Sequence, residues 1–160
     1  MRVLPAHPSP RLIVNCDGAA RGNPGPAGIG AVVRDERGRV LRKVAEGIGV
    51  ATNNVAEYRA ALAGLQAARE LGAKSVLLRS DSRLLIEQLA GRFRVKNPTL
   101  IRLYQEVRDV TRTFPGGVAF EHVPRELNRD ADRLANRGVD MWLAGEGSDW
   151  SAPGPSPELF

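Results

Sequence analysis

Asp17 is an acidic residue at a position where a carboxylate is unusual. It ends the apolar run RLIVNCD, which is typical of a short β-strand, and Gly18 follows at once. Alternation along such a strand places Ile13, Asn15 and Asp17 on one face. A carboxylate buried there needs a cation or hydrogen-bond donors to compensate its charge. The alternative is an exposed strand end where Asp17 caps a turn, and this residue taken alone favours the alternative.

Asp81 repeats the situation in SVLLRSDS, a strand that leads straight into a helix. In open α/β sheets, ligand-binding and catalytic groups gather at the carboxyl ends of the strands. The alternative is a helix N-cap, because an Asp or Ser before a helix satisfies free backbone N–H groups. Ser80 and Ser82 can cap the helix equally well, which favours another role for Asp81.

Two further acids lie in expected helices. Glu57 stands in TNNVAEYRAAL, close to the caps and side-chain donors of residues 52–54. An ordinary first-turn acid that interacts with the helix dipole is the alternative. Asp132 stands in NRDADRLANR, one helical turn from Asn128, whereas the competing Asp130 points to nearly the opposite side. Each of these acids, taken singly, is typical of a helix surface.

The apolar spacing predicts the elements that position these acids. Short strands are expected over residues 11–17, 28–35, 38–48, 75–80 and 116–123, with a hairpin turn at 35–38. Helices are expected over residues 54–71, 82–89, 98–110 and from a capping Asn128 to about Val139. The order βββαβα(α)βα indicates the α/β class, with a mixed sheet flanked by helices.

One domain accounts for most of the 160 residues. We expect residues 1–10 to be disordered, residues 11–140 to form the domain, and residues 141–160 to form a flexible acidic and proline-rich tail. No apolar run is long enough to cross a membrane, and prolines interrupt the stretch where a signal peptide needs apolar residues. The single cysteine, Cys16, excludes an internal disulfide and a zinc site built from several cysteines. A cytoplasmic domain is therefore expected.

The charge of the chain is uneven along its length. The whole chain has a net charge of +5, but four acidic residues and no Lys or Arg follow Val139, so residues 1–139 carry +9. A compact basic body favours a polyanionic partner such as a nucleic acid, although many basic domains bind no polyanion.

Four motifs in one order carry a specific resemblance. CDGAARGNPGPAGIG, ATNNVAEYRA, LRSDSRLL and NRDADRLAN resemble the corresponding motifs of type 1 ribonuclease H, and the resemblance covers residues 11–139. It implies a ribonuclease H-like fold, a five-stranded mixed sheet with three antiparallel strands followed by parallel ones. It also implies an endoribonuclease that cuts the RNA strand of RNA/DNA hybrids to 5′-phosphate and 3′-hydroxyl ends, and that removes R-loops and RNA primers.

The resemblance also implies a metal site. Matched motif by motif, the family's four carboxylates fall on Asp17, Glu57, Asp81 and Asp132. They would bind two Mg²⁺ ions, with Mn²⁺ as a substitute, which activate the attacking water and stabilise the leaving 3′-oxygen. Family roles would have Asp17 bridge both ions, Glu57 and Asp81 hold the ion on the leaving-group side, and Asp132 hold the other.

Substrate contacts are implied in the same way. Gly18 would lie against the RNA, and Asn23 and residues Thr52, Asn53 and Asn54 would bond phosphates, sugars or minor-groove edges. Hybrids are recognised through 2′-hydroxyls and shape, so low sequence specificity is expected. Further contacts are expected from three basic side chains, Arg83, Arg94 and Lys96.

The chain departs from the family pattern in three places. Many members carry a mobile His before the last helix, but here His122 falls on the expected last strand and Arg125 or Glu126 occupies the loop. The segment GRFRVKNP is too short for the Lys/Trp-rich helix of some members and leaves a reduced patch that includes Phe93. Arg83 stands where relatives often have Gln, and it either contacts phosphate or faces solvent.

Two other functions stay open from the residues alone. One is a domain that binds hybrids without cleaving them, which would show salt-sensitive binding and no Mg²⁺-dependent turnover. The other is a nuclease of DNA junctions on the same fold, which the TNN…E motif and the glycine-rich first loop disfavour. The resemblance implies a monomer, and no exposed apolar stripe in the sequence argues otherwise.

Overall fold

A five-stranded sheet carries helices on both of its faces. The structure, a computed structural model, describes residues 10–145. Its strands are β1 (Arg11–Ala20), β2 (Gly25–Arg34), β3 (Val40–Ala51), β4 (Ser75–Ser80) and β5 (Val118–His122). Its helices are α1 (Asn53–Glu70), α2 (Arg83–Leu89), α3 (Pro98–Thr111), the 3₁₀ turn η1 (Arg125–Leu127) and α4 (Arg129–Leu143). Most of the expected disordered N-terminus and of the expected tail lies outside the described residues.

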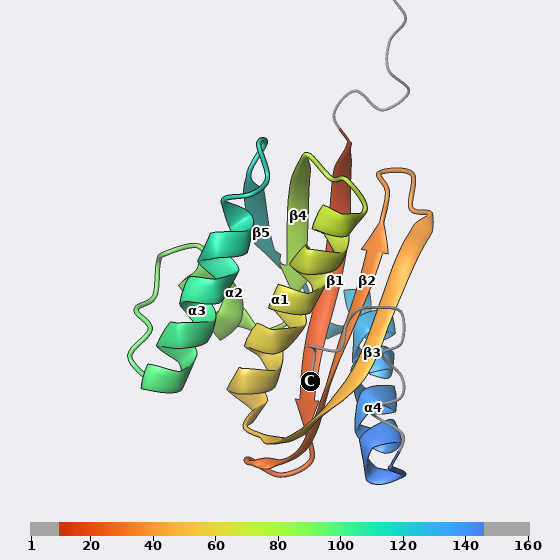
Figure 1. Ribbon diagram of the computed structural model, residues 1–160, viewed down its shortest axis with the longest axis vertical. Helices are drawn as coiled ribbons and strands as arrows, with labels where there is room; N and C mark the ends of the chain where they lie inside the picture. Colours follow the sequence, from red (N-terminus) through yellow and green to blue (C-terminus); the bar gives the residue numbers. More distant parts are fainter. Residues whose placement is uncertain (1–9, 146–160) are drawn as a thin grey trace, which may run out of the picture.

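The sheet has the mixed topology that the sequence predicts. Its strand order is β3-β2-β1-β4-β5, with β1, β2 and β3 antiparallel and with β4 parallel to both β1 and β5. Figure 1 shows α1 and α3 in front of the sheet and α4 behind it. The two parallel strands β1 and β4 lie at the centre, so their carboxyl ends open at the same edge of the sheet.

The core lies between the sheet and α1. Val14 of β1 and Leu78 of β4 are fully buried, and Tyr58 and Leu65 of α1 pack in the same cluster. Alternate positions of β1 contribute to this core, which leaves Asn15 and Asp17 for the other face. The apolar side of β1 therefore anchors the strand that carries the first acid.

The first hairpin differs from the expectation. β1 runs to Ala20 and β2 begins at Gly25, so the glycine-rich segment that reads as a loop is mostly paired strand. α4 lies directly on the backbone of β2, at Gly28 in this segment and at Gly30 beyond it. A Cβ at Gly30 would collide with the backbone of Ala131 and Ala135 in α4. Glycine serves here as a close-contact residue, which turn statistics do not reveal.

The last helix also differs, because α4 continues to Leu143 instead of ending near Val139. Val139 is fully buried, and a Cβ at Gly47 of β3 would collide with Trp142, so the extra turn rests on the sheet. No helix within residues 10–145 combines the length and the apolar character needed to span a membrane.

Candidate active site

Three acids meet where β1 and β4 end and α1 begins. One carboxylate oxygen from each of Asp17, Glu57 and Asp81 lies within 4.8 Å of the other two. The register explains this meeting, because Asn15 of β1 pairs with Arg79 of β4, and Asp17 and Asp81 each follow two residues later. Glu57 comes from the second turn of α1, which starts directly after β3.

Asp132 reaches the same place from α4. Its carboxyl group is close enough to that of Asp17 to contribute, through a hydrogen bond and through its charge, to the raised pKa of Asp17. Asp132 is exposed, whereas Asp17 and Glu57 are buried, at 5% and 6% exposure. The structure thus brings all four acids to one edge of the sheet, with Asp17, Glu57 and Asp81 in a tight cluster and Asp132 at its rim.

The acids are held where ionisation is unfavourable. Burial raises the pKa of Glu57 to about 8, and the charges of Asp81 and Asp132 add to the rise, while the Gly18 N–H opposes it. Burial also raises the pKa of Asp17 well above its usual range, and the charge of Glu57 is the next cause. Carboxylates in this arrangement ionise together when a cation compensates them. Oxygen donors of this kind are those that Mg²⁺ and Mn²⁺ prefer, so these residues fit the metal site that the resemblance implies.

Gly18 has a structural reason to be glycine. It is buried, and a Cβ there would collide with the backbone of Ala56 and Glu57 at the start of α1. Its backbone N–H donates to Glu57 Oε1 at 3.0 Å. Gly18 therefore allows β1 and α1 to approach closely enough to bring Glu57 to Asp17; contact with RNA stays a prediction.

A buried pair of amides ties α4 to β1. Asn15 Nδ2 donates to Asn128 Oδ1 at 3.0 Å, and Asn128 Nδ2 donates to the carbonyl oxygen of Cys16 at 2.9 Å. α4 begins after Asn128, but the expectation that its side chain caps the helix is wrong, since that side chain bonds β1 instead. Sequence reasoning did not assign Asn15 a role, although an amide on a buried strand face signals a specific partner.

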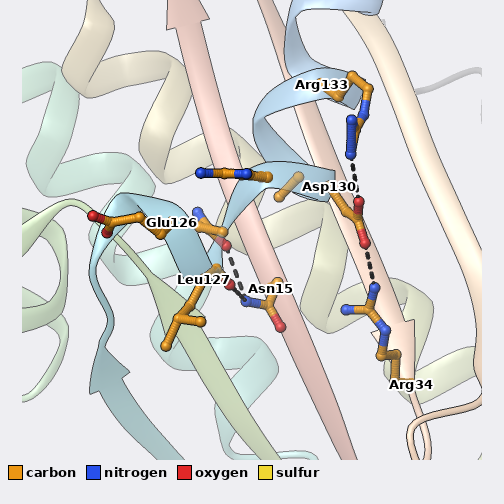
Figure 2. Close-up of a pocket in the computed structure, with 9 residues that line it drawn as sticks. Asn15, Arg34, Glu126, Leu127, Asp130 and Arg133 are labelled. Carbon is orange, nitrogen blue, oxygen red and sulfur yellow. Dashed lines mark hydrogen bonds and ion pairs between the residues drawn. The ribbon is translucent and has the colours of Figure 1, made fainter.

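A pocket of about 300 Å³ lies beside the N-terminus of α4, and Asn15 and Leu127 are among the residues that line it (Figure 2). Asp130 lies at its edge between two arginines. Arg34 Nη2 donates to it at 2.6 Å and Arg133 Nη2 at 2.7 Å. These hydrogen bonds, first from Arg133 and then from Arg34, lower the pKa of Asp130. Asp130 and Asp132 therefore face different surroundings, as their spacing on the helix predicts.

The residue facing the cluster from the loop before α4 is Arg125. Its Nε lies 3.8 Å from Asp81 Oδ2, and its side chain is 87% exposed. Glu126 lines the pocket of Figure 2 instead. His122 is the exposed last residue of β5 and pairs in register with Ser80. Of the two residues that the sequence left open for this loop, Arg125 is thus the one beside the carboxylates.

The residues expected to contact a substrate form two groups. The first surrounds the N-terminus of α1, where Thr52 Oγ1 accepts from the Val55 N–H at 3.2 Å. The Asn53 N–H donates to Asn23 Oδ1 at 3.0 Å, which joins the β1–β2 turn to α1. Asn23, Asn53 and Asn54 are exposed. Within this group, Asn53 and Asn54 lie four and three residues before Glu57 on α1.

The second group lies on the side formed by α2 and α3 (Figure 1). Arg83 is the first residue of α2, and its Nε is 3.9 Å from Glu87 Oε2. Arg94 and Lys96 are exposed in the loop between α2 and α3. Beside this loop is a groove of about 550 Å³, lined by basic and apolar side chains that include Arg92, Phe93, Arg94, Ile101 and Tyr104.

Comparison with known proteins places the chain among ribonucleases H. The family described as "Reverse transcriptase-like" matches residues 15–138. The chain is 42% identical over 124 residues to Ribonuclease HI of Halobacterium salinarum, which covers 78% of this chain and 62% of the relative. It is 46% identical over 131 residues to the bifunctional protein Rv2228c of Mycobacterium tuberculosis, which covers 81% of this chain and 36% of that protein. The chain thus spans about a third of that relative's length.

Solved structures agree. The N-terminal RNase H domain of rv2228c, solved as a fusion with maltose binding protein, superposes with a TM-score of 0.79 at 46% identity, covering 81% of this chain and 99% of that one. LC11-RNase H1 in complex with an RNA/DNA hybrid superposes with a TM-score of 0.78 at 40% identity, covering 82% and 99%. Sequence motifs, sheet topology and these matches together show that the chain belongs to the ribonuclease H family.

Proposed function

We propose that the domain is an endoribonuclease that hydrolyses the RNA strand of RNA/DNA hybrids and leaves 5′-phosphate and 3′-hydroxyl ends. The convergence of Asp17, Glu57 and Asp81 within 4.8 Å, with Asp132 beside Asp17, is the observation that supports this most strongly. A relative of 40% identity was solved in complex with an RNA/DNA hybrid, which supports the choice of substrate. In a cell, such an activity removes R-loops and RNA primers.

Asp17, Glu57, Asp81 and Asp132 would hold two Mg²⁺ ions, with Mn²⁺ as a substitute. When bound, such a pair supplies an activated water and stabilises charge on the leaving 3′-oxygen. Asp17 belongs to the three-acid cluster and also interacts with Asp132, so it is the residue that would help to hold both ions. The protein's own part is to hold four acids together before the cations arrive, through strand register, the Gly18 N–H and the packing of α4.

The hybrid would be oriented by the exposed groups beside this site. The exposed amides of Asn23, Asn53 and Asn54, with Thr52 and the Gly18 backbone, offer donors and acceptors for phosphates, sugars and 2′-hydroxyls. Duplexes of this kind are recognised through shape, phosphates and 2′-hydroxyls, so such contacts are expected to give low sequence specificity.

Basic side chains would hold the rest of the duplex. Arg94 and Lys96, with the aromatic Phe93 beside the groove on α3, combine charge and apolar surface in the manner of nucleic-acid binding surfaces. Arg83 is 72% exposed and close enough to the cluster's strand end to meet a phosphate. Arg125, beside Asp81, is a cation suited to the scissile phosphate or its neighbour.

The test is cleavage of labelled duplexes. The protein is incubated with RNA/DNA hybrid, double-stranded RNA and double-stranded DNA, each with and without Mg²⁺. We expect cleavage of the RNA strand in the hybrid, only with the metal, and no cleavage of DNA. Cleavage of DNA would indicate a nuclease of another class, and binding of the hybrid without any cleavage would indicate a binding domain.

A further inference from the structure

The turn between β1 and β2 is joined to α4 by one arginine. Arg21 Nη1 donates to Asp140 Oδ1 at 2.8 Å. Its Nη2 donates to both the carbonyl oxygen and the side-chain Oδ1 of Asn136, each at 3.3 Å. Arg21 therefore bonds two successive positions on one face of α4, since residues four apart on a helix are neighbours.

Asn136 continues this chain of contacts to the acid at the rim of the cluster. Its Nδ2 donates to the carbonyl oxygen of Asp132 at 3.1 Å and to Asp132 Oδ1 at 3.3 Å. The Asn136 amide thus uses both of its polar atoms: its oxygen accepts from the Arg21 guanidinium, and its nitrogen donates to the Asp132 carboxylate. An amide side chain offers a donor and an acceptor at once, which neither a carboxylate nor an ammonium group can do.

Asp132 gains more from such a hydrogen-bond partner than the buried acids of the cluster do. It is exposed, whereas Asp17 and Glu57 are fixed by burial and Glu57 also by the Gly18 N–H. An exposed carboxylate samples several rotamers, and binding a metal in one of them costs conformational entropy. A donor that holds Oδ1 from the neighbouring turn reduces this cost.

We propose that Asn136 is a positioning residue that orients the Asp132 carboxylate for metal binding. Arg21 couples this orientation to the β1–β2 turn. The inference rests on the proposed function, because it takes Asp132 as a metal ligand. The same turn carries Asn23, which bonds Asn53 at the start of α1. The orientation of Asp132 and the geometry of the turn proposed to bind the hybrid are therefore linked through Arg21 and Asn136.

The test measures metal binding without substrate. Mn²⁺ is titrated calorimetrically into the wild type and into Asn136→Ala, and the Mg²⁺ concentration for half-maximal hybrid cleavage is measured beside it. Outer-sphere partners of metal ligands typically affect metal affinity at least 10-fold, so we expect Asn136→Ala to bind Mn²⁺ about 10-fold more weakly. The half-maximal Mg²⁺ concentration should rise in parallel, while KM for hybrid at saturating metal changes little. Ala has a higher helix propensity than Asn, so α4 should stay folded, which thermal unfolding would verify.

The contribution of Arg21 has a matched control in Arg34. Each arginine joins the first hairpin to an aspartate of α4, Arg21 to Asp140 at 2.8 Å and Arg34 to Asp130 at 2.6 Å. Only Arg21 also bonds Asn136. We expect Arg21→Ala to weaken Mn²⁺ binding in the direction of Asn136→Ala, and to add nothing to it in the double variant. Arg34→Ala should leave Mn²⁺ affinity as in the wild type.

The outcomes separate the inference from the function on which it rests. Wild-type affinity in Asn136→Ala would overturn the role of Asn136. Equal weakening by Arg21→Ala and Arg34→Ala would overturn the role of Arg21, because general docking of α4 would then explain both. A wild type that binds no Mn²⁺ would overturn the proposed function itself and the inference with it.

Discussion

Asp130 and Asp132 stand two residues apart on α4 and have opposite electrostatic surroundings. Asp130 lies between Arg34 and Arg133, and the hydrogen bonds from these arginines lower its pKa. Asp132 lies beside Asp17, whose pKa is raised by burial and by neighbouring carboxylates. One acid has its compensating cations in the protein, and the other belongs to a cluster that, under the proposed function, receives them from outside.

This contrast separates structural acids from functional ones better than residue type does. Asp35 and Glu87 resemble Asp130, because their pKa values are lowered by bonds to the Arg39 backbone and to the Arg92 side chain. Glu57 resembles the cluster, since burial raises its pKa. Neighbouring buried acids without a compensating positive charge destabilise a fold. A cluster of such acids therefore indicates a ligand that stabilises them.

The largest expected effect is on activity. Asp132→Asn removes a proposed metal ligand, and the charge stabilisation that a bound metal supplies is worth several kcal/mol, so kcat for hybrid cleavage should fall by at least about 100-fold. Asp130→Asn is the matched control, because it makes the same change two residues away in the ion-paired group. Its kcat should stay within about threefold of the wild type, since exposed ion pairs contribute little. Steady-state kinetics would contradict the comparison if the two variants lost activity equally.

The next effect is on stability, through the metal. Mg²⁺ should raise the free energy of unfolding by about 2.7 kcal/mol at 100 times its dissociation constant, because it binds the folded cluster and relieves its repulsion. Urea unfolding with Mg²⁺ and with a chelator measures this difference. Asp130→Asn should retain the gain and Asp81→Asn should lose most of it. A gain that Asp81→Asn retains would show that Mg²⁺ binds elsewhere.

Glu57 and Asp130 should give the metal-free protein opposite dependences on pH. The folded-state pKa of Glu57, about 8, lies above its ordinary value of 4.5. Its contribution to the free energy of unfolding is therefore fully present below pH 4.5 and is lost as pH rises toward 8. The pKa of Asp130 lies below its ordinary value of 3.8, so its contribution is present above that value and is lost as pH falls. Urea unfolding with a chelator across this range should therefore show a decline toward neutral pH that Glu57→Gln reduces. An unchanged decline in Glu57→Gln would remove this acid as the cause.

The smallest effect belongs to the ion pairs themselves. Arg34→Ala breaks the bond to Asp130 and should lower the free energy of unfolding by about 1 kcal/mol or less, because the aspartate side chain is half exposed. The loss should shrink further at high salt. A loss of several kcal/mol, measured by urea unfolding, would mean that the pocket of Figure 2 is a structural centre and that the contrast with the cluster is less sharp.

The sequence is informative about this site because each acid sits in a local pattern. Asp17 ends the apolar part of β1 and Asp81 directly follows β4, and parallel pairing then brings them to one edge, as an α/β fold requires. The mixed sheet, with three antiparallel strands followed by parallel ones, followed from the order of the elements and the family resemblance.

What the sequence did not reveal depends on contacts between distant residues. The bond from Asn15 to Asn128 spans 113 positions, and the capping preference of Asn pointed to a local bond instead. The sequence placed the start of β2 at Gly28, and it did not show that Gly28 and Gly30 contact α4, because that helix lies about a hundred residues later. From the sequence alone, Arg125 and Glu126 were equal candidates for the loop residue beside the acids. In the structure, the η1 turn places Arg125 beside Asp81, and Glu126 lines the pocket of Figure 2.

The most direct measurement of the central claim is the behaviour of Asp81→Asn with an RNA/DNA hybrid. Binding and Mg²⁺-dependent cleavage are measured on the same labelled duplex for this variant and for the wild type. Cleavage should be abolished while binding survives, because the substitution removes a charge from the cluster and leaves the exposed amides and basic groove intact. An Asp81→Asn variant that still cleaves the hybrid would contradict the assignment of the four carboxylates.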